Sequence, residues 1–272
     1  MPTVTISGIE LAHRVAGQDH GTPALFIHGY TGNLRNWSLQ VKALAATGQY
    51  RCLSADNPGH GDSSAPADAR SYAFDQVADL LHQLAVDAAF APAIVFGHSM
   101  GGAIAEQYAI RYPEHVRALV LVGSAGGASG PERTDMAEPR AALRAAYAQG
   151  GMSAVYDVRA RLTPMPGYDA LPDATKTFLR AEFARTHWNG FEFGGRALHT
   201  RQETLTALAD FNKPTLIVHG AAESESLQHV SRDLTRTIRT AKHVVIANAG
   251  HSPQFENPSE FNRAMFAFLA TL

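Results

Sequence analysis

The feature that most constrains this 272-residue chain is the pentapeptide Gly97-His98-Ser99-Met100-Gly101, which Gly102 follows. An apolar stretch at residues 93–96 runs into it, and helix-forming residues 103–109 come after it. The pattern predicts a sharp turn between a buried strand and a helix, where only glycine fits two positions on either side of Ser99. Such a turn exposes the Ser99 hydroxyl above the sheet and makes it a candidate nucleophile. An ordinary glycine-rich turn with a capping serine is the simpler alternative.

Short apolar runs and helical stretches alternate along most of the chain, which is typical of a mostly parallel central sheet flanked by helices on both faces. We therefore predict the α/β fold class. Runs 3–6 and 9–15 indicate an opening antiparallel hairpin that turns at Ser7-Gly8. The other predicted strands are 24–28, 51–55, 93–97, 116–122, 215–219 and 243–247, and the predicted helices are 36–46, 75–90, 99–112, 227–237 and 258–269.

One long segment interrupts this alternation. Residues 125–210 contain no good strand, and helix formers dominate at 137–148, 174–185 and 200–208. Glycine-rich residues 123–130 lead into the segment, and a Pro/Gly break at 163–167 divides it. The sequence thus predicts an α/β core formed by residues 1–124 and 211–272, with residues 125–210 inserted as a helical cap.

The composition excludes several classes of partner. A net charge of −2 provides no basic surface of the kind that nucleic acid binding requires. The apolar runs are strand-length, so no membrane span is expected, and residues 1–10 lack the parts of a signal peptide. Cys52 is the single cysteine, which excludes an intramolecular disulfide and fits a reducing compartment. We therefore expect a cytoplasmic protein with a small-molecule substrate, and the sequence gives no sign of its oligomeric state.

A base for Ser99 should lie on a loop beyond the last strand. The chain has 13 histidines, but His251 alone lies on a polar loop, 249–253, between the final strand and the final helix. A neutral imidazole there could accept the serine proton and return it later. The carboxylate that orients it should follow the strand at 215–219, where Glu223 and Glu225 are the candidates. We favour Glu223, and a solvated loop carboxylate is the simpler alternative for either.

Backbone N–H groups near Ser99 are candidates for holding negative charge on a reacting carbonyl oxygen. Met100 supplies one donor because it follows the serine directly. The loop after His28-Gly29, at the end of an earlier strand, would supply the second from Tyr30. No metal or organic cofactor is expected, because the chain has no H-E-x-x-H spacing, no C-x-x-C and no phosphate-cradling glycine loop.

Together these residues resemble the α/β-hydrolase superfamily, in particular its small capped serine hydrolases. The resemblance covers essentially the whole chain apart from the cap, and its motifs are His28-Gly29, the loop 57–63, the turn around Ser99, the helix exit 111–116 and Gly250-His251. It implies a catalytic triad of Ser99, His251 and Glu223 that cleaves a carboxylic ester or lactone through an acyl-enzyme. The segment from Gly220 onward is similar to the N-acyl-homoserine lactonases of this fold. The superfamily usually has aspartate where this chain has Glu223.

Two other functions are compatible with the same residues. A carbon–carbon bond hydrolase or lyase acting on a keto acid or diketone would need cationic groups in the cap, and the available arginines are Arg159, Arg161, Arg180 and Arg196. Solvated helix charges are the simpler interpretation of these arginines. A ligand receptor that kept the fold without efficient turnover is an alternative of another class.

Trp188 and Phe191 are the expected substrate contacts in the cap. They flank Asn189-Gly190, which predicts a turn that would present both rings. The simpler alternative is that the cap aromatics, these two included, only pack cap helices onto the core.

Overall fold

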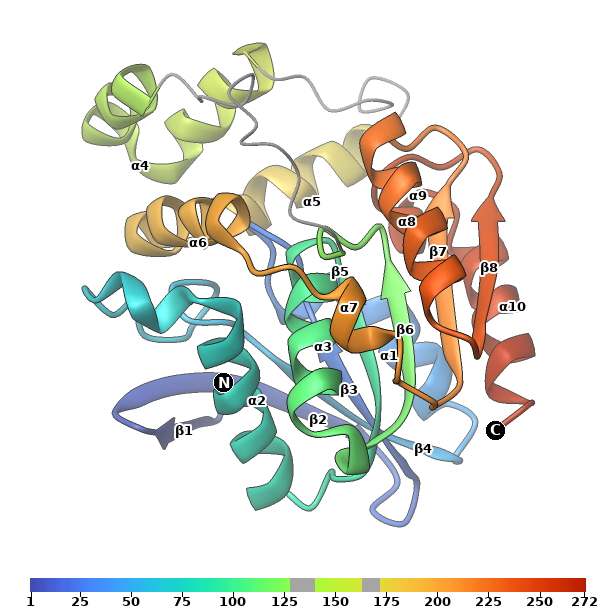
Figure 1. The fold of residues 1–272 in the computed structure, drawn as a ribbon. Coiled ribbons are helices and arrows are strands. Elements are labelled where there is room, and N and C mark those ends of the chain that lie inside the picture. Colours follow the sequence, from blue (N-terminus) through green and yellow to red (C-terminus); the bar gives the residue numbers. More distant parts are fainter. Residues whose placement is uncertain (128–139, 163–171) are drawn as a thin grey trace.

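The computed structural model describes residues 1–127, 140–162 and 172–272. Its centre is an eight-stranded sheet with the order β1-β2-β4-β3-β5-β6-β7-β8 (Figure 1). The pairs β1–β2 and β2–β4 are antiparallel, and all other pairs are parallel, which confirms the predicted fold class. The strands are β1 (Thr3–Ile6), β2 (Ile9–Gly17), β3 (Thr22–Ile27), β4 (Tyr50–Ala55), β5 (Ala93–His98), β6 (Val116–Val122), β7 (Thr215–Gly220) and β8 (Ala241–Ile246).

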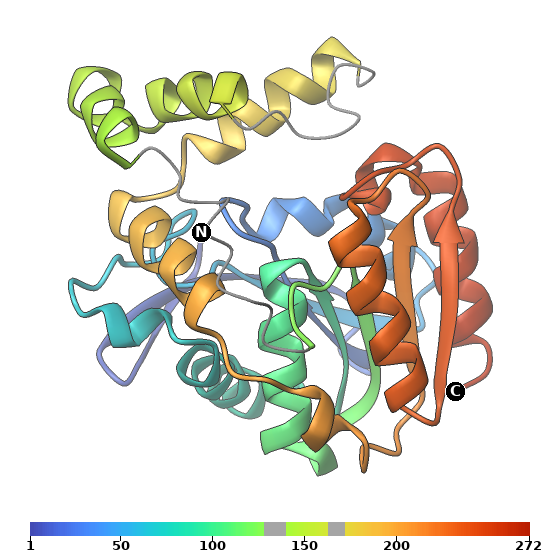
Figure 2. The ribbon, with the colours of Figure 1, turned by 45° about the horizontal axis from the view of Figure 1, so that its top comes forward.

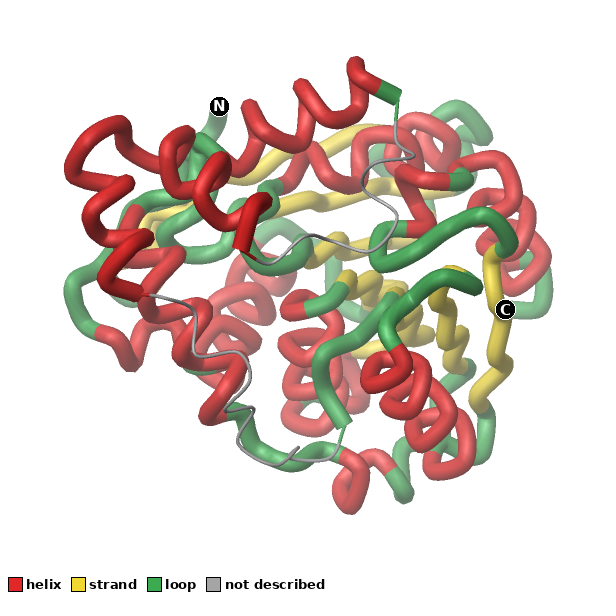
Figure 3. Tube along the Cα trace, turned by 90° about the horizontal axis from the view of Figure 1, so that it is seen from above, coloured by secondary structure: helices red, strands yellow, loops and turns green. Residues whose placement is uncertain are grey.

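Alternate residues of the central strands face opposite helical layers. In β3, Leu25 and Ile27 pack in the layer that contains α2 and α3, whereas Ala24 and Phe26 pack with α1 and α10. Both faces are therefore buried, which is why these strands are continuously apolar. Figure 3 shows helices on both sides of the strands. The helices of the two layers are α1 (Ser38–Ala45), α2 (Phe74–Asp87), α3 (Met100–Arg111), α8 (Glu225–Thr237) and α10 (Pro258–Leu269), with short turns η1 (Leu34–Trp37), η2 (Ala69–Tyr72), η3 (Pro113–His115), α7 (Leu205–Leu208) and α9 (Pro253–Glu256).

The carboxyl ends of the parallel strands lie at one edge of the sheet, so the loops that follow β3, β5, β7 and β8 meet there. Above this edge lie the cap helices, which we define as α4 (Arg140–Leu162), α5 (Asp173–Phe183) and α6 (Trp188–Thr200) (Figures 1 and 2). They have a small core of their own, made of Leu143, Ala146, Met152, Val155, Phe183 and Phe191. The division into a core of residues 1–124 and 211–272 and a cap of residues 125–210 stays a prediction.

The turn expected at Asn189-Gly190 is wrong, because both residues lie inside α6. Gly190 serves close packing there and does not break the helix. A Cβ at this position would lie 2.2 Å from the carbonyl oxygen of Gly59, so the helix rests directly on the backbone of the loop that follows β4. A tertiary contact thus explains a glycine that the local sequence assigned to a turn.

The prediction of a continuous helix at 200–208 is also wrong, because residues 201–204 are not helical. Helix α6 ends at Thr200, and α7 begins at Leu205. Between them, Thr204 donates its hydroxyl to the buried carboxylate of Glu106, a residue of α3 that is far away in the sequence. This long-range bond competes with the local helical preference, as hydroxyl side chains commonly do.

Smaller differences concern element boundaries. The helix predicted at 36–46 begins as the turn η1, and β8 begins at Ala241 rather than at residue 243. The described part of the helix predicted at 137–148 begins at Arg140 and continues to Leu162 across non-helical Gly150 and Gly151. Residues 128–130 of the glycine-rich entry and the break at 163–167 lie outside the described residues.

Candidate active site

Ser99 occupies a strained backbone conformation between β5 and α3. Its φ is 54° and its ψ is −116°, in the region that side-chain-bearing residues rarely adopt. The two flanking glycines make this turn sterically feasible. A Cβ at Gly97 would lie 2.3 Å from the Gly101 carbonyl oxygen, and a Cβ at Gly101 would lie 2.3 Å from that of Ile27. The sequence pattern therefore corresponds to a real backbone contact between strand, turn and helix.

The side chains of Ser99, His251 and Glu223 form one hydrogen-bonded row. Ser99 Oγ lies 2.9 Å from His251 Nε2, and His251 Nδ1 lies 2.6 Å from Glu223 Oε2. The serine follows β5, the glutamate follows β7 and the histidine follows β8, so three loops at the same edge of the sheet converge. Of the two carboxylates that the sequence left open, Glu223 is the buried one beside the imidazole, whereas Glu225 is exposed in the first turn of α8.

The charge on Glu223 defines the state of the imidazole. Burial raises the pKa of this carboxyl, but the bond from His251, the charge of that imidazole and the Ser224 N–H at 2.7 Å outweigh burial, so the pKa lies below its ordinary value. Glu223 is therefore ionised near neutral pH and accepts the Nδ1–H of His251. The Nε2 lone pair of the histidine then faces the Ser99 hydroxyl, which is the arrangement that a general base requires.

Two residues to which the sequence analysis gave no role, Glu256 and His98, hold the His251 loop. Glu256 accepts the N–H of Gly250 at 2.5 Å and the N–H of Ser252 at 2.7 Å, so one carboxylate fixes the backbone on both sides of the histidine. His98 Nε2 donates to the His251 carbonyl oxygen at 2.9 Å. Burial lowers the pKa of His98 to about 3, so its ring is neutral. An acidic residue five positions after a candidate base, in the first turn of the next helix, is the signal that could have indicated Glu256.

The backbone around Tyr30 approaches Ser99 closely. A Cβ at Gly29 would lie 3.2 Å from Ser99 Cβ. His28 stabilises this loop: its Nδ1–H donates to the Gly29 carbonyl at 2.8 Å, and its Nε2 accepts the Asn57 N–H at 2.9 Å. Burial lowers the pKa of His28, which keeps the ring neutral in this double role. Met100 is the first residue of α3, so its N–H has no acceptor within the helix. The roles of Tyr30 and Met100 as oxyanion donors stay predictions.

Trp188 and Phe191 lie in the first turn of α6, the cap helix that rests on the loop after β4. Phe191 is 4% exposed and belongs to the small core of the cap helices, and its ring stacks on that of Tyr30 at 5.6 Å. The Tyr30 hydroxyl also donates to the Phe191 carbonyl at 2.6 Å. Trp188 is half-buried against Tyr147, with ring centroids 4.7 Å apart. Both residues therefore pack the cap, and their contact with substrate stays a prediction.

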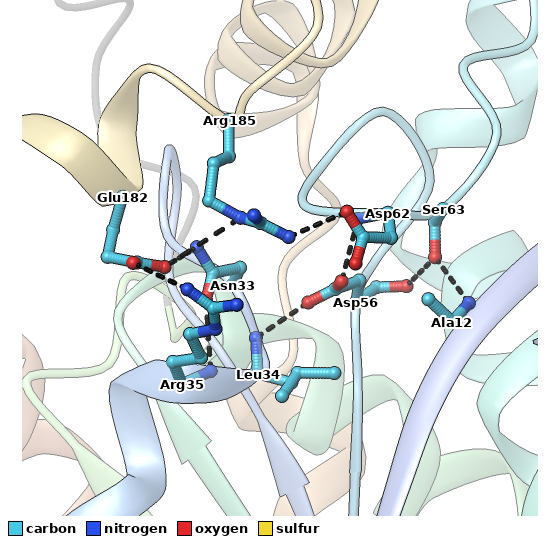
Figure 4. A network of polar contacts seen from close by, with 9 residues as sticks. All are labelled: Ala12, Asn33, Leu34, Arg35, Asp56, Asp62, Ser63, Glu182 and Arg185. Carbon is cyan, nitrogen blue, oxygen red and sulfur yellow. Dashed lines mark hydrogen bonds and ion pairs between the residues drawn. The ribbon is translucent and has the colours of Figure 1, made fainter. Parts of the chain in front are cut away.

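A polar network joins the end of α5, and the chain directly after it, to two segments of the core, one around η1 and one in the loop after β4 (Figure 4). Glu182 accepts from Asn33 at 2.6 Å and from Arg35 at 3.2 Å, and Arg185 donates to Asp62 at 2.6 Å. We call these five residues the cap latch. Beneath it, buried Asp56 accepts the N–H groups of Leu34 at 2.7 Å and Asp62 at 2.9 Å. Burial raises the pKa of Asp56 to about 6, although both N–H donors oppose the shift.

A cavity of about 550 Å³ lies beside the latch and does not include the serine. It is lined by Gly61, Asp62, Tyr147, Gly151, Met152, Ala184, Arg185, Thr186 and His187. In the described part of the chain, no group of three or more His, Cys, Asp or Glu is arranged to hold a metal ion. None of the helices described is long and apolar enough to cross a membrane.

The chain belongs to the alpha/beta hydrolase fold family, whose sequence profile matches residues 22–258. It is 28% identical over 263 residues to the AB hydrolase superfamily protein YisY of Bacillus subtilis, and the match covers 92% of each protein. A putative aryl esterase from Burkholderia cenocepacia is 28% identical, with a TM-score of 0.79 over 99% of this chain and 98% of that one. The enol-lactonase from Burkholderia xenovorans has a TM-score of 0.85 at 24% identity, over 99% and 100% of the two chains. The predicted membership of the superfamily is thereby confirmed.

Proposed function

We propose that this protein is a serine hydrolase that cleaves a carboxylic ester or a lactone through an acyl-enzyme. One observation carries the proposal: the row from Ser99 through His251 to Glu223 has contacts of 2.9 Å and 2.6 Å. A serine hydroxyl suits attack on a carbonyl carbon, whereas attack on a saturated carbon calls for a carboxylate nucleophile in enzymes of similar layout. The similarity to a putative aryl esterase gives further support.

In the acylation step, Ser99 Oγ attacks the carbonyl carbon while its proton passes to His251 Nε2. The ionised Glu223 stabilises the imidazolium that forms. The N–H groups of Tyr30 and Met100 hold the oxyanion, and one such donor contributes about 3–4 kcal/mol in well-studied cases. When the tetrahedral intermediate collapses, His251 donates its proton to the leaving alkoxide, and the acyl group remains on Ser99.

Deacylation repeats the same steps with water. His251 Nε2 accepts a proton from a water molecule, whose oxygen attacks the acyl carbon. The second tetrahedral intermediate then expels Ser99, which regains the proton from His251, and the carboxylic acid leaves. With a lactone, alcohol and acid are two ends of one product, so the open hydroxy acid departs in this last step.

Pre-steady-state kinetics with p-nitrophenyl butyrate tests this proposal. Wild type should release close to one equivalent of p-nitrophenol rapidly and then turn over more slowly, provided that deacylation is the slower step. Ser99→Ala should show neither phase while its far-UV circular dichroism stays unchanged. A folded wild type that does not react with activated esters or lactones would contradict the proposal. Saturable ligand binding without any burst would instead favour the alternative function, a ligand receptor without efficient turnover.

A carbon–carbon bond hydrolase is the second candidate, and one contact favours it. The guanidinium of Arg159 lies 5.6 Å from the centroid of the Tyr30 ring, so a cap cation is close to the loop of the proposed oxyanion donor. Arg180, by contrast, is paired with Asp157 through two hydrogen bonds of 2.9 and 2.7 Å. Parallel assays with an aryl ester and a vinylogous diketone acid separate the candidates. Arg159→Ala, compared with the exposed Arg161→Ala, should impair only turnover of the acidic diketone if this second function holds.

A further inference from the structure

Glu106 is a fully buried carboxylate that the proposed chemistry does not use. It lies on α3, the helix that begins directly after Ser99, and its exposed fraction is 0%. Three donors satisfy it: the Ser124 hydroxyl at 2.7 Å, the Gly127 N–H at 2.9 Å and the Thr204 hydroxyl at 2.5 Å. Burial raises the pKa of Glu106 against the effect of these donors. Burying an acid is costly without hydrogen-bond partners, and these three donors offset that cost by drawing separate chain segments onto one side chain.

The partners of Glu106 lie at both ends of the cap segment. Ser124 and Gly127 belong to the chain that leaves β6 for the cap, and Thr204 belongs to the chain that returns from α6. The two ends also bond each other: the Thr204 N–H donates to the Gly127 carbonyl at 3.1 Å, and the Gly127 N–H, which Glu106 shares, donates to the Thr204 hydroxyl at 3.0 Å. A Cβ at Gly126 would lie 2.0 Å from Glu106 Oε2, so the outgoing chain is pressed against the carboxylate.

The outgoing chain, residues 123–127, also touches the proposed triad. The Ala125 N–H donates to the carbonyl oxygen of Ser99 at 3.0 Å. Gly123 has a φ of +50°, and a Cβ there would lie 3.2 Å from Glu223 Oε2 and 3.3 Å from His251 Nδ1. Five consecutive residues therefore run from the triad, past the nucleophile's own carbonyl, to the carboxylate of Glu106.

From this geometry we propose that Glu106 is a positioning residue, which clamps both ends of the cap to the nucleophile helix and so couples cap placement to the Ser99 turn. The kinetic part of this inference rests on the proposed hydrolase function. The bond from Thr204 to Glu106 holds the chain that returns from the cap, and its loss should weaken substrate binding. The bonds from Ser124 and Gly127 to Glu106 hold the chain that is bonded to Ser99, and their loss should slow the chemical step.

The first test compares Thr204→Val with Thr200→Val. Both remove one hydroxyl near the end of α6, but Thr200 is exposed, and its hydroxyl donates within its own helix to the Arg196 carbonyl. With p-nitrophenyl butyrate, Thr204→Val should raise KM about three- to tenfold and change kcat less, because one buried hydrogen bond to the Glu106 carboxyl group is lost. Thr200→Val should match wild type. Equal kinetics and equal exchange at the Ala125 N–H in the two variants would overturn the proposal.

The second test compares Glu106→Gln with Glu106→Ala. The carboxamide keeps an acceptor for Gly127 and Thr204, so Glu106→Gln should stay within about threefold of wild type, whereas Glu106→Ala should lose about ten- to a hundredfold in kcat. Equal damage in both variants would contradict the clamp. If Glu106→Ala does not fold, the Thr204 comparison decides alone.

Amide exchange separates the two proposals. Hydrogen exchange, followed by NMR at the Ala125 N–H, which bonds the Ser99 carbonyl and not Thr204, should be at least about tenfold faster in Thr204→Val than in Thr200→Val if the clamp is real. This readout requires no substrate. If wild type hydrolyses no ester and the two variants still differ in amide exchange, the hydrolase function alone is refuted. Active enzymes with identical exchange would refute the clamp alone.

Discussion

The sheet edge that carries Ser99 and the surface on which the cap helices rest are held together in different ways. At the sheet edge, backbone meets backbone: a Cβ at Gly97, Gly101 or Gly220 would lie only 2.2–2.3 Å from a carbonyl oxygen. At the cap, side chains such as Glu182 and Arg185 reach core loops through hydrogen bonds and ion pairs. Backbone packing thus fixes the candidate triad, whereas the cap depends on one such contact, Gly190 against Gly59, together with polar contacts that each have modest net strength.

The sharpest test of this contrast concerns the two carboxylates after β7. Glu223→Gln should lower kcat by about 10³–10⁴, because the neutral amide no longer holds His251 in the productive tautomer or stabilises its charged form. Glu225→Gln is the matched control and should leave kcat within about twofold, since exposed substitutions have small effects. Steady-state hydrolysis of p-nitrophenyl butyrate measures both. Comparable losses in the two variants would remove Glu223 from its proposed role.

Replacing one glycine by alanine in each region should show whether activity depends on the Ser99 turn or on the cap. Gly101→Ala places a Cβ 2.3 Å from the Ile27 carbonyl oxygen, and Gly190→Ala places one 2.2 Å from that of Gly59. Both should lose about 1–3 kcal/mol in the free energy of unfolding in urea. Only Gly101→Ala should also lose most of its activity toward p-nitrophenyl acetate, a substrate too small to depend on the cap. An inactive but folded Gly190→Ala would break the contrast.

Asp56, which lies beneath the cap latch, should make the stability of the protein depend on pH. Its pKa is raised from 3.8 to about 6, so the folded state binds this proton more tightly than the unfolded state. The stabilisation is therefore complete below pH 3.8 and lost as the pH rises through about 6. Between pH 7 and pH 4, wild type should gain about 2–3 kcal/mol in the free energy of unfolding relative to Asp56→Asn. Urea unfolding of both proteins measures it, and a constant difference would show that Asp56 does not titrate in this range.

The smallest expected effect concerns the rings of α6. Trp188→Ala should change the preference between p-nitrophenyl butyrate and octanoate about three- to tenfold, the scale of one or two methylene contacts. Phe193→Ala is the control, because its ring packs on Tyr72 of the core at 5.4 Å. Unchanged preference in a folded Trp188→Ala would leave this residue, like Phe191, with a packing role alone.

The sequence was sufficient to predict those parts that short-range constraints define. The strands are apolar because both sheet faces are covered, and the glycines around Ser99 are required by the turn itself, so both appear in local patterns. The place of His251 between the last strand and the last helix made it the predicted base. The structure then placed Glu223, not Glu225, against it.

The parts that the sequence did not predict depend on long-range contacts. The local sequence predicts a turn at Gly190 and a helix through Thr204. The structure instead shows Gly190 packed on Gly59 and Thr204 bonded to Glu106. Glu106, Glu256 and Glu182 are single acidic residues in helices, which the sequence cannot distinguish from solvated charges. Their partners lie in other elements, and only the folded chain brings them together.

The most direct test of the central proposal is to locate the acyl group. Wild type is mixed with p-nitrophenyl butyrate, quenched in acid within the burst phase, digested and analysed by peptide mass spectrometry. We expect a butyryl group on Ser99 in a large fraction of the molecules and none in Ser99→Ala treated in the same way. Turnover with an unmodified Ser99, or with the acyl group on another residue, would contradict it.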